Sequence, residues 1–425
     1  MKHISDLSSP LFGGEPKRIV VIGGGAVGAL TAFELQRAGH KVTLLEARSW
    51  GNGSSSRSAA CIRAQFDNPS TVRGMVYCEE YYKQWAEVVG GIHSPITQNG
   101  YLFLKDLNED MDAVRRVVEM QRSAGLSDVE ILTRGELDVR FPYLETTGIQ
   151  GATWCPSDGF LDPALVYGDA AEMAQKLGAT TMQNVEVVGV IFENGRPISV
   201  KTADGREFTG DIFVNACGVW APKVSAMFDG YPLDIKARRR YLHFLAGFNG
   251  RAGDYMSAED FGQMPMIITP RRCYSRPESR KGSQLMMGWM QPAKPVRPEF
   301  GNQDEVEEGF GRMGERGTAL RKEVGTYVPD IEHMGGVEHV TTGFYEDTPD
   351  HNPLIGFDPW TPNLVHAAGF SGHGLMHAPF TAAAVVNLVA AGKNLPMVCL
   401  PLVGDVDIGS FAVDRVWKTG EGMVI

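Results

Sequence analysis

Residues 18–28 read RIVVIGGGAVG, and this stretch decides the fold. Its first five residues form a largely apolar run that predicts a buried strand. The next six carry glycines at positions 23, 25 and 28, and residues 29–38 then show helical periodicity that stops at Gly39. A second apolar strand is predicted at residues 41–45, directly before Glu46. The stretch therefore predicts a strand–helix–strand unit that binds a dinucleotide.

Each glycine of this motif has its own expected role. Gly23 permits a tight turn, Gly25 lets the backbone approach a pyrophosphate, and Gly28 lets the helix pack closely on the strand. The free N–H groups at the helix N-terminus suit phosphate. Glu46 is expected to accept hydrogen bonds from ribose hydroxyls, and its negative charge disfavours NADP. Because no second glycine motif follows, we expect one bound dinucleotide.

The composition limits the possible classes of protein. The chain has 425 residues, a net charge of −11 and 43% hydrophobic residues, which predicts two to three folded domains. The acidic charge argues against nucleic-acid binding, and we expect no membrane span because no sufficiently long apolar run occurs. The six cysteines are scattered and form no CxxC pair, so we expect a reducing, cytoplasmic location. No histidine spacing favours a metal site.

The rest of the chain alternates between helical and strand patterns. Gly-rich or Asn-Gly and Asp-Gly turns separate many of the segments. Helices are predicted at residues 69–89, 109–124, 162–177, 304–323 and 379–391. Strands are predicted at residues 100–104, 185–192, 198–202, 211–216, 241–248, 284–290 and 363–368.

Four blocks of sequence resemble one known family. They are residues 20–46, which begin VVIGGG; residues 53–66, which read GSSSRS and continue to CIRAQF; VNACGVWA at 214–221; and AGFSGHGL at 368–375. Together they resemble the D-amino-acid oxidase superfamily of FAD enzymes, in the branch of sarcosine oxidase and the sarcosine oxidase β subunit.

The resemblance implies an α/β fold with a Rossmann-like FAD-binding domain and an α+β substrate domain built on an antiparallel sheet. The FAD-binding domain is expected to be discontinuous, at residues 1–95, 150–225 and 340–425. The substrate-binding domain is expected at residues 96–149 and 226–339.

The resemblance also assigns roles along the cofactor. It implies that Val185 offers its backbone to adenine. The remaining cofactor-binding residues fall in four groups. The ADP half is assigned to Gly23, Gly25, Ala26, Val27, Gly28 and Glu46; the phosphate and ribityl path to Ala47, Arg48, Ser54, Ser55, Arg57, Ser58 and Ala59; a return strand to Ala216, Gly218 and Trp220; and the isoalloxazine loop to Gly369, Gly372, His373, Gly374, Leu375 and Met376.

Two departures from the family bear on how FAD is attached. Monomeric relatives attach FAD to a Cys, and Gly343 stands at that position here. Other relatives use a His near the second block, where residues 55–58 read SSRS. We therefore expect non-covalent FAD.

For the substrate, the resemblance implies three catalytic residues. Arg63 matches the arginine that meets the substrate carboxylate, for which a guanidinium is suited by its bidentate fork; the alternative is pairing with an acidic side chain or a flavin phosphate. Tyr345 is either beside the substrate or a core aromatic, and His373 either bonds the flavin or supports its loop. Met376 stands where relatives carry a second cation.

The expected reaction is oxidation of a secondary or N-alkylated amino acid, from CH–NH to the imine, by hydride transfer to flavin N5. Two alternatives remain open: an FAD-dependent 2-hydroxy-acid dehydrogenase, and a non-catalytic FAD-containing assembly factor. A homo- or hetero-oligomer is possible. The triplet Arg238–Arg240 is expected at a solvated strand end, with recognition of an acidic substrate group as the alternative. Residues 286–290 are expected to form an apolar cavity wall.

The electron acceptor is expected to be O₂, a quinone or another flavoprotein. Oxidases of this branch carry a Lys and a His where Met286 and Met290 stand in this sequence. A neutral thioether supplies no charge to stabilise superoxide. This substitution favours slow reaction with oxygen.

Overall fold

The computed structural model describes residues 15–247, 258–278, 284–289, 294–300, 302–312 and 314–417. At its centre, β1 (Arg18–Ile22) pairs in parallel with β2 (Lys41–Leu45) on one side and β13 (Ile212–Asn215) on the other. Both of the first two strands begin and end where the sequence predicts. The complete sheet has the order β19-β20-β13-β1-β2-β9. Its outer strands are β9 (Thr180–Met182), β20 (Leu364–Ala368) and the antiparallel β19 (Leu354–Phe357).

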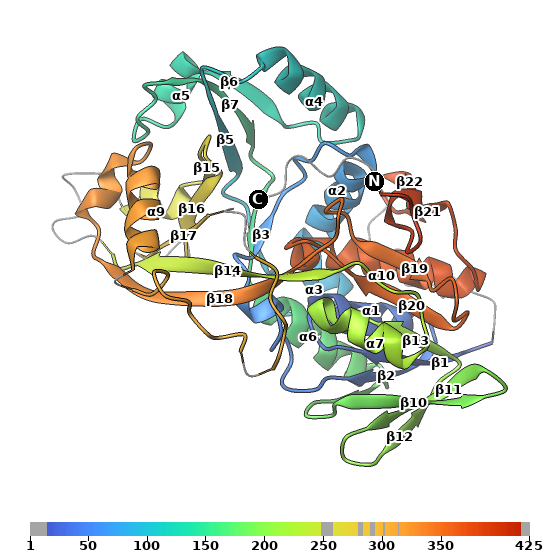
Figure 1. Ribbon diagram of the computed structural model, residues 1–425. Helices are drawn as coiled ribbons and strands as arrows, with labels where there is room; N and C mark the ends of the chain where they lie inside the picture. Colours follow the sequence, from blue (N-terminus) through green and yellow to red (C-terminus); the bar gives the residue numbers. More distant parts are fainter. Residues whose placement is uncertain are drawn as a thin grey trace.

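Helices cover one face of this sheet and a small second sheet covers the other. On the first face, α1 (Ala26–Arg37) packs between α6 (Pro163–Lys176) and α10 (Gly374–Ala391). On the other face, apolar side chains of β1 and β13 join those of α7 (Ala221–Met227) and of a three-stranded sheet. That sheet consists of β10 (Val187–Glu193), β11 (Arg196–Thr202) and β12 (Glu207–Thr209). This layered α/β arrangement confirms the Rossmann-like fold (Figure 1).

The largest sheet has eight strands and lies beside the first unit, which is the six-stranded sheet with its covering helices and small sheet (Figure 1). It is antiparallel except where β15 pairs in parallel with β5. One face carries the helices α5 (Arg134–Arg140), α8 (Ala258–Gln263) and α9 (Glu315–Gly325). In spatial order the strands are β18 (Val337–Asp347), β14 (Lys236–Leu245), β17 (Leu285–Trp289), β16 (Cys273–Pro277), β15 (Met266–Ile268), β5 (Tyr101–Asp106), β7 (Ile149–Cys155) and β6 (Glu130–Thr133).

Smaller elements connect these units. The α2 helix (Pro69–Lys83) packs on α10 and is followed by α3 (Trp85–Val88), while α4 (Met111–Ser123) contacts α2 and β6. The short strands are β3 (Cys61–Ile62), β8 (Gly159–Leu161) and β4 (Ile96–Thr97) in one sheet, and β21 (Met397–Leu400) with β22 (Gly404–Asp407) in another.

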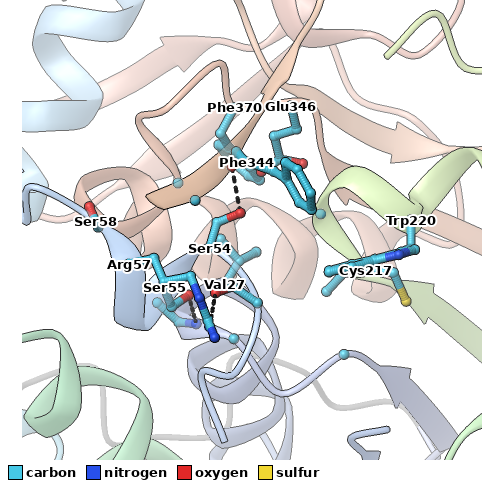
Figure 2. Close-up of a pocket in the computed structure, with 18 of the residues that line it drawn as sticks. Val27, Ser54, Ser55, Arg57, Ser58, Cys217, Trp220, Phe344, Glu346 and Phe370 are labelled. Carbon is cyan, nitrogen blue, oxygen red and sulfur yellow. Dashed lines mark hydrogen bonds between the residues drawn. The ribbon is translucent and has the colours of Figure 1, made fainter. Parts of the chain in front are cut away.

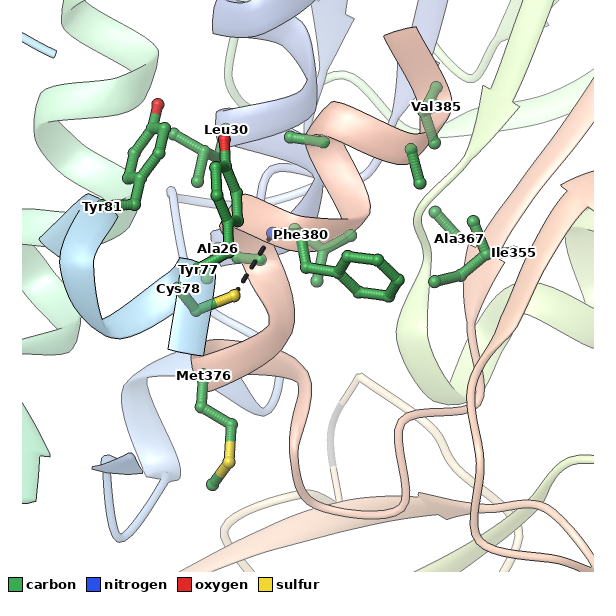
Figure 3. Close-up of a cluster of buried hydrophobic side chains, with 14 of the residues drawn as sticks. Ala26, Leu30, Tyr77, Cys78, Tyr81, Ile355, Ala367, Met376, Phe380 and Val385 are labelled. Atoms are coloured by element: carbon green, nitrogen blue, oxygen red, sulfur yellow. Dashed lines mark hydrogen bonds between the residues drawn. The ribbon is translucent and has the colours of Figure 1, made fainter. Parts of the chain in front are cut away.

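Helix α10 forms the centre of the apolar core. Among the described residues it is the one helix whose length and composition suffice to cross a bilayer, but most of it is buried against α1 and α2. Figure 3 shows Phe380 of α10 near Cys78 of α2. The Phe380 N–H follows Pro379 and donates to the Cys78 sulfur at 3.3 Å. Core packing therefore accounts for the apolar character of α10.

Three predicted elements differ from the structure. The predicted helix at 304–323 is wrong in its first half, because Gly309, Gly311 and Gly314 interrupt the segment and only α9 is helical. Helix α10 begins at Gly374 rather than at Pro379, directly after the glycine-rich turn. Strand β14 begins at Lys236 instead of Tyr241. Phe248 and Met290, the last residues of two predicted strands, lie outside the described residues.

The division into two discontinuous domains stays a prediction. Two strands of the eight-stranded sheet, β7 and β18, cross the boundaries drawn at residues 149/150 and 339/340.

Candidate cofactor and substrate site

A long cavity of about 1460 Å³ runs from the turn after β1 to the loop before α10. Its walls come from segments far apart in the sequence: the β1–α1 turn, residues 53–59, the end of β13, and strands β14 and β18 of the large sheet. Figure 2 shows Val27, Ser54 and Ser55 on one side and Trp220 and Cys217 on the other. Because the cavity lies at the carboxyl ends of β1 and β13, it occupies the position where open α/β sheets bind ligands.

The glycines at one end of the cavity are required by close packing. A Cβ atom on Gly28 would lie 1.9 Å from the Gly23 carbonyl oxygen, and one on Gly23 would lie 2.4 Å from the Ala216 oxygen. Gly23 also has a φ of +107°, which disfavours a side chain. The helix and the two central strands therefore approach one another only because these positions lack side chains.

The Glu46 side chain closes the same end. One carboxylate oxygen accepts from the Gly24 N–H at 2.7 Å and the other from the Arg48 N–H at 2.8 Å. Burial raises the pKa of Glu46, while these two backbone hydrogen bonds act in the opposite direction. A carboxylate offers about four lone-pair sites, so acceptor capacity remains on the cavity side for ribose hydroxyls. The Val185 N–H donates to the Glu46 backbone oxygen at 2.8 Å, which holds Val185 against this wall.

Residues 54–58 form the middle of the wall. The Ser55 hydroxyl accepts from the Ala26 N–H at 3.1 Å, and the Ser54 hydroxyl donates to the Phe344 oxygen at 2.6 Å (Figure 2). The Ser58 hydroxyl accepts from the Ala60 N–H at 2.9 Å. Arg57 forms an ion pair with Asp304 at 2.7 Å. The Ser54 hydrogen bond thus joins this segment to β18 of the large sheet, and the Ser55 hydrogen bond joins it to α1.

The structure places most of the predicted cofactor residues on this one cavity. Gly28, Arg48, Gly369, His373 and Met376 are not among its wall residues. Gly28 acts through packing, and the Arg48 guanidinium lies over Phe300, which does line the cavity. The predicted residues on the wall are Gly23, Gly25, Ala26, Val27, Glu46, Ala47, Ser54, Ser55, Arg57, Ser58, Ala59, Val185, Ala216, Gly218, Trp220, Gly372, Gly374 and Leu375.

The far end of the cavity holds a buried carboxyl group. The Glu346 side chain accepts from the Gly369 N–H at 2.8 Å, and its own backbone oxygen accepts from the Ser371 N–H at 3.2 Å. Burial raises the pKa of Glu346 to about 7. A Cβ on Gly372 would lie 2.3 Å from the Tyr345 ring, so this loop packs tightly against β18.

A second, smaller cavity adjoins this end. It shares Ser58, Ala59, Tyr274, Tyr345 and Gly372 with the large cavity. Its other walls are Cys61, Arg63, Tyr101, Met266, His373 and Met376. The three predicted catalytic residues, Arg63, Tyr345 and His373, therefore line one small chamber together with Tyr101 and Tyr274.

Arg63 is fully buried and held by its own segment. Its guanidinium donates to the Gln65 backbone oxygen and lies 3.8 Å from the centre of the Phe66 ring. Behind it, the Asp158 carboxylate accepts from the Ala64 N–H at 2.7 Å and from the Gln65 amide at 2.8 Å. Burial raises the pKa of Asp158 to about 6, and the charge of Arg63 opposes that rise. The segment thus presents a fixed cation to the small chamber.

His373 and Tyr345 are uncharged groups in this chamber. Burial first, and then the charge of Arg63, lowers the pKa of His373 well below its ordinary value. Its Nε2 has no hydrogen-bond partner among the residues described. Burial raises the pKa of Tyr345 to about 12. Both side chains can therefore exchange hydrogen bonds with a ligand at neutral pH.

Comparison with known proteins identifies the family. The model described as "DAO: FAD dependent oxidoreductase" matches residues 18–388. The chain belongs to this family. FAD-dependent oxidoreductase domain-containing protein 1 of Xenopus laevis is 24% identical over 440 residues, covering 94% of this chain and 82% of that protein. Monomeric sarcosine oxidase of a Bacillus species is 24% identical, covering 93% of this chain and 95% of the oxidase.

Solved structures of the same fold agree with this assignment. The structure of L-proline dehydrogenase from P. horikoshii has a TM-score of 0.77 and 29% sequence identity, and the match covers 89% of this chain and 95% of that one. The sequence-based recognition of the D-amino-acid oxidase family, and of its sarcosine oxidase-like branch, is confirmed.

The cavity fits FAD, the cofactor of the DAO family. The α1 N-terminus and Ser54–Ser55 suit a pyrophosphate, Glu46 suits the adenosine ribose, and the small residues at 372–375 leave room for a flat ring. When bound there, FAD supplies a hydride acceptor for substrate oxidation. The residues at 372–375 and on β18 would hold the flavin ring at the end of the cavity next to the Arg63 chamber.

Sequence reasoning missed several wall residues, including Arg240, Tyr274, Phe300 and Glu346. The expectation that Arg238–Arg240 form a solvated strand end is wrong: they lie within β14, Arg239 is buried, and Arg240 lines the cavity. Strand alternation was the available signal, because Arg240 and the buried Leu242 are two residues apart and share one face.

The expectation of an apolar wall at residues 286–290 is also wrong for the described part of that segment. Met286 is buried among Phe244 and Tyr274 and borders neither cavity. Met266 of β15 supplies the thioether wall instead. Slow reaction with oxygen stays a prediction.

Proposed function

We propose that the protein uses FAD to oxidise the CH–NH bond of a secondary or N-alkylated amino acid. The observation that carries this proposal is the buried Arg63 guanidinium on the wall of a small chamber that shares part of its wall with the FAD cavity. A guanidinium in such a place suits a carboxylate because it offers two parallel N–H donors. The rest of the wall combines the thioethers of Met266 and Met376 with tyrosine rings, which suits an uncharged amine and its alkyl group.

The names of two relatives support this substrate class. Sarcosine and proline, the substrates named for the oxidase and the dehydrogenase above, are both secondary amines with a carboxylate. In the proposed reaction, Arg63 holds the carboxylate and thereby orients the neighbouring C–H bond toward the cofactor. Tyr274 and Tyr345 close the chamber against water, and neutral His373 offers one ring nitrogen as donor and one as acceptor.

The test is anaerobic bleaching of the bound flavin by a panel of N-methyl, cyclic and opine-type amino acids, with matched primary amino acids and 2-hydroxy acids. Bleaching by the secondary amines, faster than by any other class, supports the proposal. Bleaching by 2-hydroxy acids alone overturns it in favour of a hydroxy-acid dehydrogenase. No bleaching by any compound overturns it in favour of a non-catalytic role for FAD.

We further propose that FAD is held without a covalent bond. Gly343 offers no nucleophile, and a Cβ there would already lie 2.9 Å from the Arg57 Cβ atom. Precipitation with trichloroacetic acid is expected to release all of the yellow colour into the supernatant. Colour that stays with the washed pellet would contradict this.

A further inference from the structure

Arg240 is a largely buried cation on the wall of the FAD cavity that the proposed reaction does not use. It lies on β14 opposite Gly343 of β18, and its side chain is 14% exposed. Two of its three nitrogens, Nε and Nη1, are buried and have no hydrogen-bond partner among the residues that the structure describes. Leaving buried donors of a charged group without acceptors is costly, which points to a ligand that supplies the acceptors.

The charge of Arg240 is only partly compensated. Its ion-pair partner is Asp347, with 3.9 Å between Arg240 Nη2 and the carboxylate. The same oxygen of Asp347 lies closer to Arg238, at 3.0 Å from Nε. Two guanidinium groups therefore share one carboxylate. The Tyr345 ring, with its centre 5.0 Å from the Arg240 Cζ atom, is neutral and adds no compensating charge.

The position of Arg240 indicates which ligand it would contact. Arg240 lines the large cavity and is absent from the wall of the small chamber, where Arg63 lies. It is close to Tyr345, which packs on Gly372, so it lies at the end of the cavity where the flavin ring belongs. We propose that Arg240 donates hydrogen bonds to the ring of bound FAD and stabilises negative charge that develops on it.

This role has a physical consequence that requires no substrate. A nearby, poorly solvated cation stabilises an anionic form of the flavin far more than a solvated one does. Sulfite is the probe, because its adduct with oxidised flavin is anionic and bleaches the visible absorbance. The test therefore reports on Arg240 whether or not the proposed amine substrate is right.

The experiment compares the dissociation constant of sulfite and the midpoint potential of the flavin in FAD-loaded variants. Arg240→Gln is expected to weaken sulfite binding by at least about tenfold and to lower the potential, because one buried charge is lost. Arg240→Lys, which keeps the charge, is expected to lie closer to the unmodified protein. Asp347→Asn removes the compensating carboxylate and is expected to shift both measurements in the opposite direction.

Lys236→Gln is the matched control. Lys236 lies on the same strand but is exposed and paired with Asp234, so its loss is expected to change sulfite affinity by no more than about twofold. If Arg240→Gln binds FAD fully and leaves sulfite affinity and potential unchanged, the proposal is overturned. The same holds if only the KM for substrate rises, which would assign Arg240 to the substrate. Should Arg240→Gln fail to fold, an unshifted Asp347→Asn protein overturns the proposal.

Discussion

The two ends of the FAD cavity are built in different ways. The nucleotide end is built mainly on one short segment, β1 to β2, in which glycines allow backbone contacts and Glu46 accepts from two backbone N–H groups. The flavin end is lined by residues from β14, β16 and β18, together with the loop before α10. The nucleotide end depends on glycines, whose missing side chains allow close backbone contacts. The flavin end depends on the charge and shape of its side chains.

This contrast predicts where a change will be felt. A substitution at the nucleotide end displaces backbone and affects all cofactor binding. A substitution at the flavin end changes one contact and leaves the cofactor in place. The variants below test that difference, beginning with the largest expected effect.

Gly28→Ala is expected to abolish stable FAD binding. Its new Cβ atom would lie 1.9 Å from the Gly23 oxygen, so α1 must move away from β1. Overpacking of this kind costs about 3 kcal/mol, enough to weaken the cofactor roughly a hundredfold. Flavin content after purification and a fluorescence titration with FAD measure the loss.

Gly168→Ala is the matched control for Gly28→Ala. Gly168 lies in α6 with no atom within 4 Å of the added Cβ. Here alanine is expected to stabilise the helix by about 0.5–1 kcal/mol and to leave FAD binding unchanged. Equal FAD affinity in the two variants would refute the view that close packing governs the nucleotide end.

Arg63→Met is expected to raise the KM for an amino-acid substrate about a hundredfold while FAD stays bound. Two charge-assisted hydrogen bonds to the carboxylate are lost, and each contributes about 1.5–3 kcal/mol. Arg63→Lys keeps the charge without the bidentate fork, so its KM is expected to lie between those of Arg63→Met and the unmodified protein. Steady-state kinetics together with flavin content separate the effects, and an unchanged KM would remove Arg63 from the substrate site.

The same contrast explains how far the sequence predicts the molecule. Gly28 and Glu46 could be placed because their nearest partners, Gly23 for the first and Gly24 and Arg48 for the second, lie within about thirty residues in a unit with known periodicity. Arg240 and Tyr274 could not, because their position depends on the register of β14 against β18 and of β16 against β17. Successive arginines of the triplet face opposite sides of the sheet, but the sequence alone does not show which of them faces the cavity.

Glu346 and Gly369 illustrate the same limit. The glycine was predicted from the AGFSGHGL block, but the carboxyl that accepts its N–H stands 23 residues away in another strand. Pairing of this kind depends on how the two units dock. The pairing of Glu346 with Gly369 therefore could not be predicted from the sequence and is seen only in the structure.

Glu346→Gln is expected to change the pH dependence of stability. The pKa of Glu346 is raised from 4.5 to about 7 by burial, so between these values the folded protein binds more protons than the unfolded chain. Its contribution to the free energy of unfolding is therefore present at low pH and is lost as pH rises, by roughly 2 kcal/mol between about pH 5.5 and about pH 7.5.

Glutamine keeps the carbonyl acceptor for the Gly369 N–H and does not ionise. The difference in Tm between Glu346→Gln and the unmodified protein is therefore expected to grow in favour of the variant as pH rises. Thermal unfolding followed by circular dichroism across this range measures it. A constant difference at every pH would show that Glu346 does not titrate with a raised pKa.

Tyr345→Phe is expected to have the smallest effect of the series. The phenylalanine ring keeps the contact with Gly372 and the face presented to Arg240, so only the hydroxyl is lost. Losing one neutral hydrogen bond costs about 1 kcal/mol, which predicts a fall in kcat/KM of less than about tenfold. Because the pKa of Tyr345 is raised to about 12, its hydroxyl stays protonated across the working range. The pH profile of kcat/KM is therefore expected to keep its shape below about pH 10, whereas a lost basic limb in the variant would identify Tyr345 as a titrating group and contradict its assignment as a neutral wall of the chamber.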